Sequence, residues 1–301
     1  MPQPSVISVI LNTNHREDTL RCLVSLAEST YENHKTIVLD NDSADGSVEA
    51  IRKAFPRVEI IGLSENRGYA GNNNVGITAA LAQGADWVFV LNEDTVLAPD
   101  CLPHLVTVGE SDPRIGIVGP MVYHHEEPAI IQSAGGMISH YWESLHLGKD
   151  ELDRGQFSEP HLVDWISGCG ILVRRALIEQ VGMIDERYFY YWEETEWCLR
   201  AGKAGLWVVH VPQAKMWHKG VRRDYHPKPL VTYYGTRNRL LTLAKCQASP
   251  LAWVIVWLQI LRTLTSWTIK PKWRSMREHR NAMWRGVVDF LCHRWGGPVK
   301  L

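Results

Sequence analysis

Short apolar runs alternate with mixed polar and apolar segments along the first third of the chain. The apolar runs predict four strands, at residues 6–11, 36–39, 58–61 and 86–91. The segments between them have the periodicity of amphipathic helices, at residues 18–29, 47–54 and 74–83. This strand–helix rhythm predicts an α/β fold in which a mostly parallel sheet is flanked by helices.

Each predicted strand is followed by polar side chains. The four clusters are Asn12-Thr13-Asn14, Asp40-Asn41-Asp42, Asn66-Arg67-Gly68 and Asn92-Glu93-Asp94. Open parallel sheets bind their ligands beyond the carboxyl ends of the strands. We therefore expect all four clusters to line one pocket.

The rest of the chain is less regular until its C-terminal part. Residues 116–160 suggest loops and short antiparallel strands, and strand character returns at 164–174 and 206–211. A turn that leads into a helix is expected at 189–199, and an amphipathic helix at 233–245. We divide the chain into a catalytic domain, 1–225, with halves at 1–115 and 116–225, and a helical C-terminal region, 226–301.

Composition narrows the class of protein. The 301 residues are 45% hydrophobic and 22% charged, which is typical of a globular protein. The six cysteines show no CxxC spacing, so neither a zinc site nor a disulfide framework is expected. The N-terminal segment lacks the pattern of a signal peptide. These features together predict a cytoplasmic location.

Asp94 is the first candidate for chemistry. A carboxylate at the end of a buried strand, beside Asn92 and Glu93, suits a divalent cation that bridges a phosphate. The alternative is a turn in which Asp94 caps the next element. Asp40 ends another strand and could accept a hydrogen bond from a nucleotide base, although turn and cap roles also explain the segment around it.

The segment 66–76 is rich in Gly and Asn and precedes a predicted helix. Such a segment exposes backbone N–H groups to a phosphate, and Arg67 adds positive charge. It matches neither the GxGxxG pattern of dinucleotide-binding proteins nor the GxxxxGK[ST] pattern of P-loops.

Two further positions carry candidate chemistry. Glu193 and Glu194 follow a run of aromatic residues, and a carboxylate enclosed by aromatic rings has a raised pKa that suits a general base. The alternative is that both acids merely favour the start of a helix. His218 follows a predicted strand and could reach a metal ion held by Asp94.

Taken together, the order and spacing of these motifs resemble family 2 inverting glycosyltransferases of the GT-A fold, which is Rossmann-like. The motifs that carry the resemblance are Asp40–Ser47, Asn66-Arg67-Gly68 with Gly71-Asn72-Asn73, Asn92-Glu93-Asp94, Ser167-Gly168, Glu193-Glu194 and His218. The branch that it resembles most contains rhamnosyltransferases and galactofuranosyltransferases. The resemblance covers about 6–220 and extends more loosely through Tyr233-Tyr234 and Arg237-Asn238.

The resemblance implies a role for each motif. It implies transfer of a sugar from a UDP- or dTDP-linked donor to a saccharide or lipid-linked saccharide, with Mn²⁺ or Mg²⁺ as cofactor, in the synthesis of a cell-surface glycan. The donor would contact Asn12, Thr13, Asp40, Asp42, Arg67, Gly68, Gly71, Asn72, Asn92 and Glu93. Asp94 and His218 would hold the metal ion. Glu194 would be the catalytic base, and we place the acceptor at Trp165, Gly168 and Trp192.

This chain departs from the family pattern at two positions, which leaves alternatives open. Asn92 stands where a DxD motif has its first Asp, and Glu194 stands where the base is usually Asp. Glu193 or, less favoured, Glu196 could be the base instead. A binding module of this fold that lacks turnover is one alternative function, and a nucleotidyltransferase is another. The latter class requires a Gly-rich segment where Asn12-Thr13-Asn14-His15 stands.

The C-terminal region has a distinct composition. Six of the 13 Trp residues follow Leu251, and nine Lys or Arg residues stand against two acids from Arg262 onward, although the formal net charge of the chain is −1. Trp with interleaved cations is typical of segments that lie at a membrane surface. We expect peripheral membrane contact rather than nucleic-acid binding, with a helical cap or a homodimer interface as the alternative.

Overall fold

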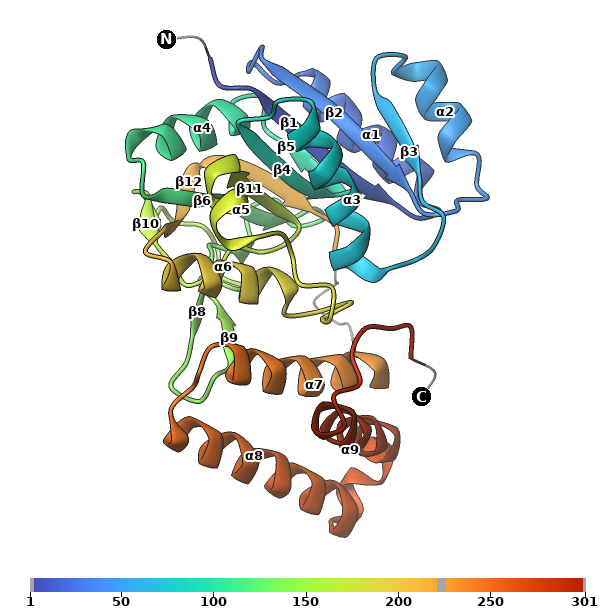
Figure 1. The fold of residues 1–301 in the computed structure, drawn as a ribbon, viewed down its shortest axis with the longest axis vertical. Helices are drawn as coiled ribbons and strands as arrows, with labels where there is room; N and C mark the ends of the chain where they lie inside the picture. Colours follow the sequence, from blue (N-terminus) through green and yellow to red (C-terminus); the bar gives the residue numbers. More distant parts are fainter. Residues whose placement is uncertain (1–2, 221–225, 300–301) are drawn as a thin grey trace.

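The computed structural model describes residues 3–220 and 226–299 and is built around one ten-stranded sheet (Figure 1). The order along the sheet is β10 (His161–Leu162), β12 (Trp207–His218), β6 (Ile115–His124), β11 (Gly170–Arg174), β4 (Trp87–Asn92), β1 (Val6–Asn12), β2 (His34–Asp40) and β3 (Glu59–Gly62). β5 (Thr95–Leu97) pairs with β12, and β7 (Ile131–Ser133) pairs with β6. A separate hairpin joins β8 (Gly136–Ile138) to β9 (Ser144–His146).

The strand directions confirm the predicted α/β fold with a mostly parallel sheet. β1 is parallel to both β2 and β4, β2 is parallel to β3, and β6 is parallel to β12. β11 runs antiparallel between β4 and β6. In this register Asn12 lies beside Asp40, and Leu11 lies beside Asn92. The polar ends of the strands therefore meet at one edge.

Helices cover both faces of the sheet because the central strands β1, β4, β6 and β11 bury side chains on both sides. One core cluster joins the sheet to α1 (Arg16–Ala27), α2 (Ser47–Ala54) and α4 (Cys101–Ser111). The other joins it to α3 (Gly68–Ala82), α5 (Arg175–Val181) and α6 (Glu193–Lys203). The result is a three-layer arrangement that fixes the site at the strand ends.

Several elements differ from the sequence expectation. β6 is a fully buried strand of 10 residues in a region predicted to be loops and short strands, because Gly119-Pro120 interrupts its apolar pattern. β12 continues to His218 rather than ending at 211, since a register shift between Val211 and Lys215 hides the continuation. α3 starts at Gly68, so the Gly/Asn segment is the first turns of a helix and not a loop.

The C-terminal region is helical, as predicted. It contains α7 (Pro229–Lys245), α8 (Pro250–Ile269), the short 3-10 helix η1 (Pro271–Met276) and α9 (Arg277–Leu291). α7 lies between the sheet domain and α8 (Figure 1). Leu240, Val256 and Val287 form a small core of their own. Over the residues described, none of the helices has both the length and the apolar character needed to cross a membrane. The expected domain boundary at 225 falls within 221–225, outside the described residues.

Candidate active site

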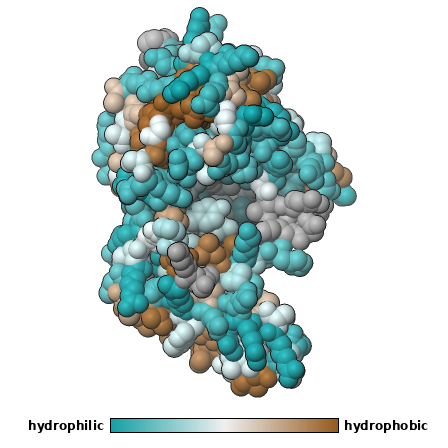
Figure 2. Space-filling model, turned by 90° about the vertical axis from the view of Figure 1, so that its right-hand side faces the viewer, coloured by the Kyte–Doolittle hydropathy of each residue, from teal (hydrophilic) through white to brown (hydrophobic). Residues whose placement is uncertain are grey.

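A cavity of about 490 Å³ lies at the carboxyl ends of β1, β2 and β4. It is lined by Leu11, Thr13, His15, Asn41, Asn66, Gly68, Tyr69, Asn72, Asn92, Glu93, Asp94, Phe189, Tyr190, His218 and Gly220. Figure 2 shows a face of the molecule that is hollowed at the level between the sheet domain and the C-terminal helices. All four polar clusters predicted from the sequence contribute to this lining.

Asp94 and His218 contact each other in the wall of the cavity. The register of β12 with β5 places His218 opposite Thr95, and its Nε2 lies 3.1 Å from Oδ1 of Asp94. The other carboxylate oxygen of Asp94 accepts a hydrogen bond of 2.8 Å from the backbone N–H of Gly220. On its far side, Nδ1 of His218 donates to Oε1 of Gln132 over 2.6 Å. Asp94 and His218 are 124 positions apart in the sequence, and the pairing of β5 with β12 brings them together.

The protonation of this pair follows from its surroundings. Burial acts to raise the pKa of Asp94, but the hydrogen bond and charge of His218 outweigh it, so that the pKa falls to about 2. Burial acts in the opposite sense on His218, yet the neighbouring Cys169 and Asp94 hold the pKa of its imidazole well above the ordinary value. Burial raises the pKa of Glu93 to about 7, and the charge of Asp94 adds to this.

Asp94 and His218 fit a divalent cation by their chemistry. Carboxylate oxygen and imidazole nitrogen are both ligands of Mn²⁺, and a histidine ligand commonly donates its other ring N–H to a carbonyl or carboxylate, as His218 does to Gln132. No group of three His, Cys, Asp or Glu side chains suited to a metal gathers within 3–220 and 226–299. An ion held by this pair would need further ligands from a bound substrate or water.

Asn12 lies beneath the cavity surface and holds Asp40 by a hydrogen bond. Its side chain is fully buried, where its amide nitrogen donates to Asp40 over 2.8 Å and its oxygen accepts from Thr19 over 2.8 Å. Direct contact between Asn12 and a donor, which the family resemblance implied, would therefore require a different conformation of this side chain. Asn12 orients Asp40, whose other oxygen accepts from the backbone N–H of Ser43 over 3.1 Å.

The N-terminus of α3 points at the cavity through Gly68 and Tyr69. The helix dipole at such an end favours an anion, although the N–H groups of Gly68 and Tyr69 already donate to Oδ1 of Asn66 and to the carbonyl of Phe189. Asn72 lines the cavity too, and its side-chain oxygen accepts from the backbone N–H of Arg67 over 3.0 Å. The guanidinium of Arg67 instead pairs with Glu186, so Arg67 does not line the cavity in this structure.

Two other residues predicted to bind the donor lie away from the cavity. Gly71 faces the side chains of Arg67 and Glu186, since a Cβ there would meet both. Asp42 is exposed, in a left-handed turn with φ 56°, and is absent from the cavity lining. Neither residue has a contact that supports donor binding here.

Glu193 and Glu194 begin α6 beside Tyr69. Gly168 has Oη of Tyr69 and Cγ of Glu194 as its neighbours, and Tyr69 donates to the Gly168 carbonyl over 2.5 Å. Burial raises the pKa of Glu194, and burial together with the charge of Glu194 raises that of Glu193 well above the ordinary value. Both carboxyls therefore have the proton affinity of candidate bases, and Tyr69 links them to the cavity.

Glu193 and Glu196 are less suited to contact a substrate. Glu193 is 4% exposed, and its Oε2 has no hydrogen-bond partner among the described residues. Glu196 is paired with Arg200 and Lys245, which gives it a structural role and agrees with its low rank as a base. Glu194 is the more accessible of the three.

Two of the three residues expected to bind the acceptor lie near Glu194. Trp192 precedes Glu193 directly, and Gly168 contacts the side chain of Glu194. Trp165 is only 2% exposed and packs in the core against His146, so it cannot touch an acceptor in this conformation.

The segment before α6 has an unusual backbone. Phe189, Tyr191 and Trp192 have φ values of 61°, 68° and 74°, in the left-handed region that residues with a Cβ seldom adopt. Each such residue costs on the order of 1–3 kcal/mol and persists only when its surroundings hold it. This strained segment, residues 188–192, leads directly to Glu193 and Glu194.

Two side chains of α7 hold this segment. The amide nitrogen of Asn238 lies 2.8–2.9 Å from the carbonyl oxygens of Tyr188, Tyr190 and Tyr191. Arg237 donates to the carbonyl of Tyr188 over 3.0 Å. Both side chains are buried. The family resemblance included Arg237 and Asn238 without a role for either, and a polar pair on the buried side of an amphipathic helix is the sign in the sequence that points to one.

Comparison with known proteins agrees with this geometry. The family profile described as "Glycosyl transferase family 2" matches residues 5–182, which span the sheet from β1 to the end of α5. The chain belongs to glycosyl transferase family 2. It is a glycosyltransferase of the GT-A fold, in the branch that contains rhamnosyltransferases and a galactofuranosyltransferase.

Named relatives support this branch. The glycosyltransferase is 33% identical over 217 residues to the N-acetylglucosaminyl-diphospho-decaprenol L-rhamnosyltransferase of Mycobacterium tuberculosis. The aligned region covers 66% of this chain and 70% of the relative. It is 26% identical over 298 residues to the dTDP-rhamnosyl transferase RfbF of Shigella flexneri, covering 94% and 95% of the two chains.

Solved structures confirm the fold of the glycosyltransferase. The mannosyltransferase PcManGT from Pyrobaculum calidifontis, in complex with GDP-Man and Mn²⁺, superposes with a TM-score of 0.60 at 14% identity and covers 98% of this chain and 89% of its own. TarS of S. aureus, in complex with UDP-GlcNAc, superposes with a TM-score of 0.61 at 13% identity and covers 94% and 80%.

Proposed function

We propose that this glycosyltransferase is a metal-dependent, inverting enzyme that transfers a sugar from a nucleoside diphosphate to a saccharide acceptor. The observation that carries the proposal is the cavity at the strand ends. It brings Asp94 and His218 opposite the N-terminus of α3, with Glu194 behind Tyr69. A diphosphate placed there meets a cation site on one side and a helix N-terminus on the other.

Different residues around the cavity would contact different parts of the donor. Thr13 and Asn41 lie where Asp40 ends β2, which suits the base and ribose. The positive end of the α3 dipole, at Gly68 and Tyr69, suits the phosphates. Asp94 and His218 would hold Mn²⁺ or Mg²⁺, which when bound offsets the negative charge of the departing nucleoside diphosphate.

Glu194 is the proposed base. A carboxylate whose pKa is raised by burial accepts a proton more readily near neutral pH than an ordinary glutamate does. Its oxygen would take the proton of the acceptor hydroxyl as that hydroxyl attacks the anomeric carbon from the face opposite the leaving group. Trp192 and Gly168 would lie on the acceptor side of Glu194.

The names of the relatives support a choice of donor and acceptor. One relative is a dTDP-rhamnosyl transferase, and another transfers L-rhamnose to a diphospho-decaprenol-linked sugar by its name. We therefore propose dTDP-rhamnose or a UDP-sugar as donor and a saccharide or lipid-linked saccharide as acceptor, in surface polysaccharide synthesis. Free cysteines, five of them buried, are consistent with action at the cytoplasmic face of a membrane.

The test is nucleotide release from a panel of UDP- and dTDP-sugars, with Mn²⁺, Mg²⁺ or chelator. We expect turnover of one donor that chelator and Asp94→Ala abolish. Glu194→Gln should lower transfer by about 10²–10⁴-fold while donor binding, measured by calorimetry, is unchanged. Glu193→Gln is the matched control and should lower transfer far less. Turnover that resists chelator would contradict the metal role of Asp94 and His218, and full activity of Glu194→Gln would contradict its role as base.

A further inference from the structure

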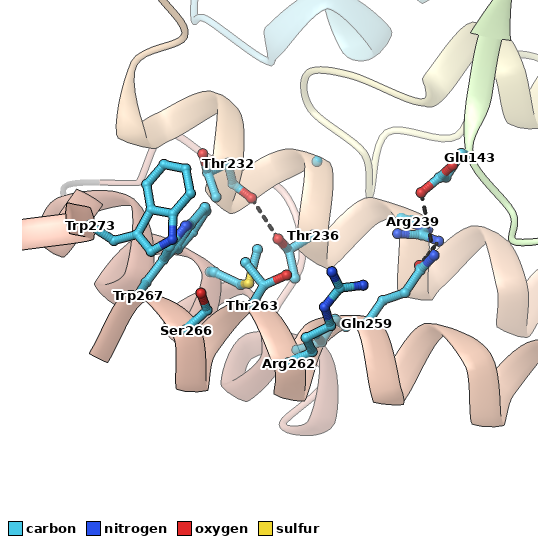
Figure 3. Close-up of a pocket in the computed structure, with 13 residues that line it drawn as sticks. Glu143, Thr232, Thr236, Arg239, Gln259, Arg262, Thr263, Ser266, Trp267 and Trp273 are labelled. Carbon is cyan, nitrogen blue, oxygen red and sulfur yellow. Dashed lines mark hydrogen bonds between the residues drawn. The ribbon is translucent and has the colours of Figure 1, made fainter. Parts of the chain in front are cut away.

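A second cavity lies in the C-terminal region, away from the active site. It has a volume of about 620 Å³ and lies between α7 and α8, as Figure 3 shows. Its lining consists of Glu143, Thr232, Gly235, Thr236, Arg239, Gln259, Ile260, Arg262, Thr263, Ser266, Trp267, Trp273 and Met283. We call it the α7–α8 cavity. No part of the proposed reaction uses it.

Two guanidinium groups reach this cavity from opposite helices. Arg239 of α7 donates from Nη2 to Oε1 of Gln259 over 2.7 Å and to the carbonyl of Tyr141, but its buried Nε has no hydrogen-bond partner among the described residues. Arg262 of α8 extends toward α7 (Figure 3), and no ion pair to it is found within the described part of the chain. Arg262 therefore offers guanidinium donors to the cavity, and Arg239 adds a positive charge to the lining while Gln259 and Tyr141 hold its side chain in place.

The remaining lining suits a phosphate group. Thr263 and Ser266 supply hydroxyl groups, whereas the hydroxyls of Thr232 and Thr236 already bond His279 and the Thr232 carbonyl. Guanidinium groups recognise phosphate oxygens by paired, charge-assisted hydrogen bonds, which hydroxyl donors complement. Glu143 also lines the cavity and lies 3.4 Å from Nε2 of Gln259, so it offsets one of the two positive charges and leaves the lining net positive.

An exposed apolar stripe runs along α8 beside the cavity. Its members, each more than half exposed, are Leu251, Val254, Leu258, Leu261 and Ile269. Their spacing of three, four, three and eight residues places them on one face of the helix. Arg262 follows Leu258 by four residues and is adjacent to Leu261, so its guanidinium stands at the border between stripe and cavity.

Cations flank the end of this stripe. Lys270, Lys272, Arg274 and Arg277 are exposed along η1 and the start of α9. At the lower end of the molecule, where these helices lie, hydrophobic and hydrophilic surfaces are side by side (Figure 2). An amphipathic helix with cations at its edge is suited to lie in the interface of an anionic bilayer.

We propose that the α7–α8 cavity binds the headgroup phosphate of an anionic membrane lipid while the stripe of α8 enters the hydrocarbon. Charge complementarity selects this occupant, because the apolar stripe and the phosphate-binding donors meet at Arg262. The proposal is independent of the sugar-transfer reaction. It gives the enzyme a means to remain at the surface where a lipid-linked acceptor would lie.

Gly235 offers a direct probe of the cavity. It lines the cavity from α7, and a Cβ added there meets nothing within 4 Å. Gly235→Trp would therefore fill the space without removing a charge, and Gly235→Ala is its matched control. Arg239→Gln combined with Arg262→Gln removes both cations. Lys53→Gln combined with Arg57→Gln removes the same charge from an exposed surface of the sheet domain.

The experiment measures partition of the full chain onto vesicles of phosphatidylglycerol and phosphatidylcholine, and onto phosphatidylcholine alone. We expect binding to the anionic vesicles, weakened about tenfold or more by the Arg239/Arg262 double variant and by Gly235→Trp, but less than about twofold by either control. Partition of Gly235→Trp equal to that of Gly235→Ala would overturn the cavity assignment. Equal binding to both vesicle compositions would overturn the phosphate assignment.

A second measurement separates a lipid from a free phosphate compound. Calorimetry with a short-chain, soluble phosphatidylglycerol should show binding that inorganic phosphate does not match and that Gly235→Trp abolishes. Equal affinity for inorganic phosphate would overturn the lipid as occupant. Nucleotide release from the donor, measured without vesicles, should be the same in all these variants. Failure of the proposed reaction and failure of lipid binding are thus read from different assays.

Discussion

The side-chain amide of Asn238 donates a hydrogen bond of 2.8 Å to the carbonyl of Tyr191, two residues before Glu193. Asn238 belongs to the C-terminal helix α7, whereas Glu193 and Glu194 begin α6 of the sheet domain. The C-terminal region therefore completes the active site, since it holds the strained backbone that positions the proposed base.

Asn238→Ala tests this support. Removing the amide leaves carbonyl groups of the buried segment without a donor, which should lower the free energy of unfolding by about 1–3 kcal/mol. Misplacement of Glu194 should lower kcat by up to about 10²-fold, with the donor dissociation constant unchanged. Hydrogen exchange of 188–192 should quicken. The measurements are transfer kinetics, calorimetry with donor, and exchange by mass spectrometry.

A matched control for this substitution lies on α9. The side chain of Asn281 accepts hydrogen bonds from the adjacent Arg280 near the surface, so Asn281→Ala should leave kcat and exchange unchanged. If Asn238→Ala altered donor affinity and kcat equally, with exchange faster throughout the protein, its role would be general stability and not positioning.

Gly68 sets the contact between α3 and the same strained segment. Its φ is 74°, and a Cβ would lie 2.3 Å from the carbonyl oxygen of Phe189. Gly68→Ala should therefore displace Phe189 and lower both stability and transfer. Gly84→Ala is the control, because Gly84 has a φ of 84° with nothing within 4 Å of its Cβ. Gly84→Ala should cost only the backbone strain of a left-handed residue with a Cβ, about 1 kcal/mol. If the two variants lowered the unfolding temperature and kcat by equal amounts, a clash between residue 68 and Phe189 would be contradicted.

Gln132 should increase the metal affinity of the proposed ligand His218. Its Oε1 accepts the Nδ1 proton over 2.6 Å, which leaves Nε2 directed at Asp94. Loss of such a partner typically weakens metal affinity about 10–100-fold. Gln132→Ala should do so for Mn²⁺, as measured by electron paramagnetic resonance of the free ion, while Gln132→Glu, which keeps an acceptor, should retain affinity. An unchanged Mn²⁺ affinity in Gln132→Ala would argue that His218 is not a ligand.

The sequence predicted the sheet and its polar edge because both arise from local patterns. Four apolar runs and the residues that follow them needed no knowledge of distant contacts. It missed the length of β6 and β12 because Pro120 and Pro212 interrupt their patterns, and strands tolerate such residues only where the register adjusts. The start of α3 was missed because Gly and Asn are poor helix formers, and tertiary contacts with Phe189 override that preference.

The sequence predicted which residues of the candidate site follow the strands. It predicted less well which of these side chains contact one another or the cavity. Asp94 and His218 could be paired from the family pattern, and the structure places them in contact. The family pattern placed Asn12 and Arg67 at the donor, and Trp165 was expected at the acceptor, but burial or a competing partner decides the contacts of all three. The role of Asn238 depends on α7 packing against a segment about 50 residues earlier in the chain, which a single sequence does not reveal.

Glu193 gives a prediction about stability and pH. Burial and the charge of Glu194 raise its pKa well above the ordinary value, so the folded state binds a proton that the unfolded state releases at lower pH. The stability gained from the protonated form is full below the ordinary glutamate pKa and is lost as the pH rises through the raised value. Glu193→Gln, which imitates the protonated side chain, removes this loss.

Relative to the wild type, Glu193→Gln should therefore become more stable as the pH rises from 5 to 8, by about 1–3 kcal/mol at the upper end. Denaturant unfolding at both pH values measures the difference, and Glu32→Gln, at an exposed position, should show no such trend. A difference that shrinks with rising pH would mean that the folded protein stabilises the charged form of Glu193. In that case the unpartnered Oε2 would have to bind a proton donor in solution, and Glu193 would compete with Glu194 as the base.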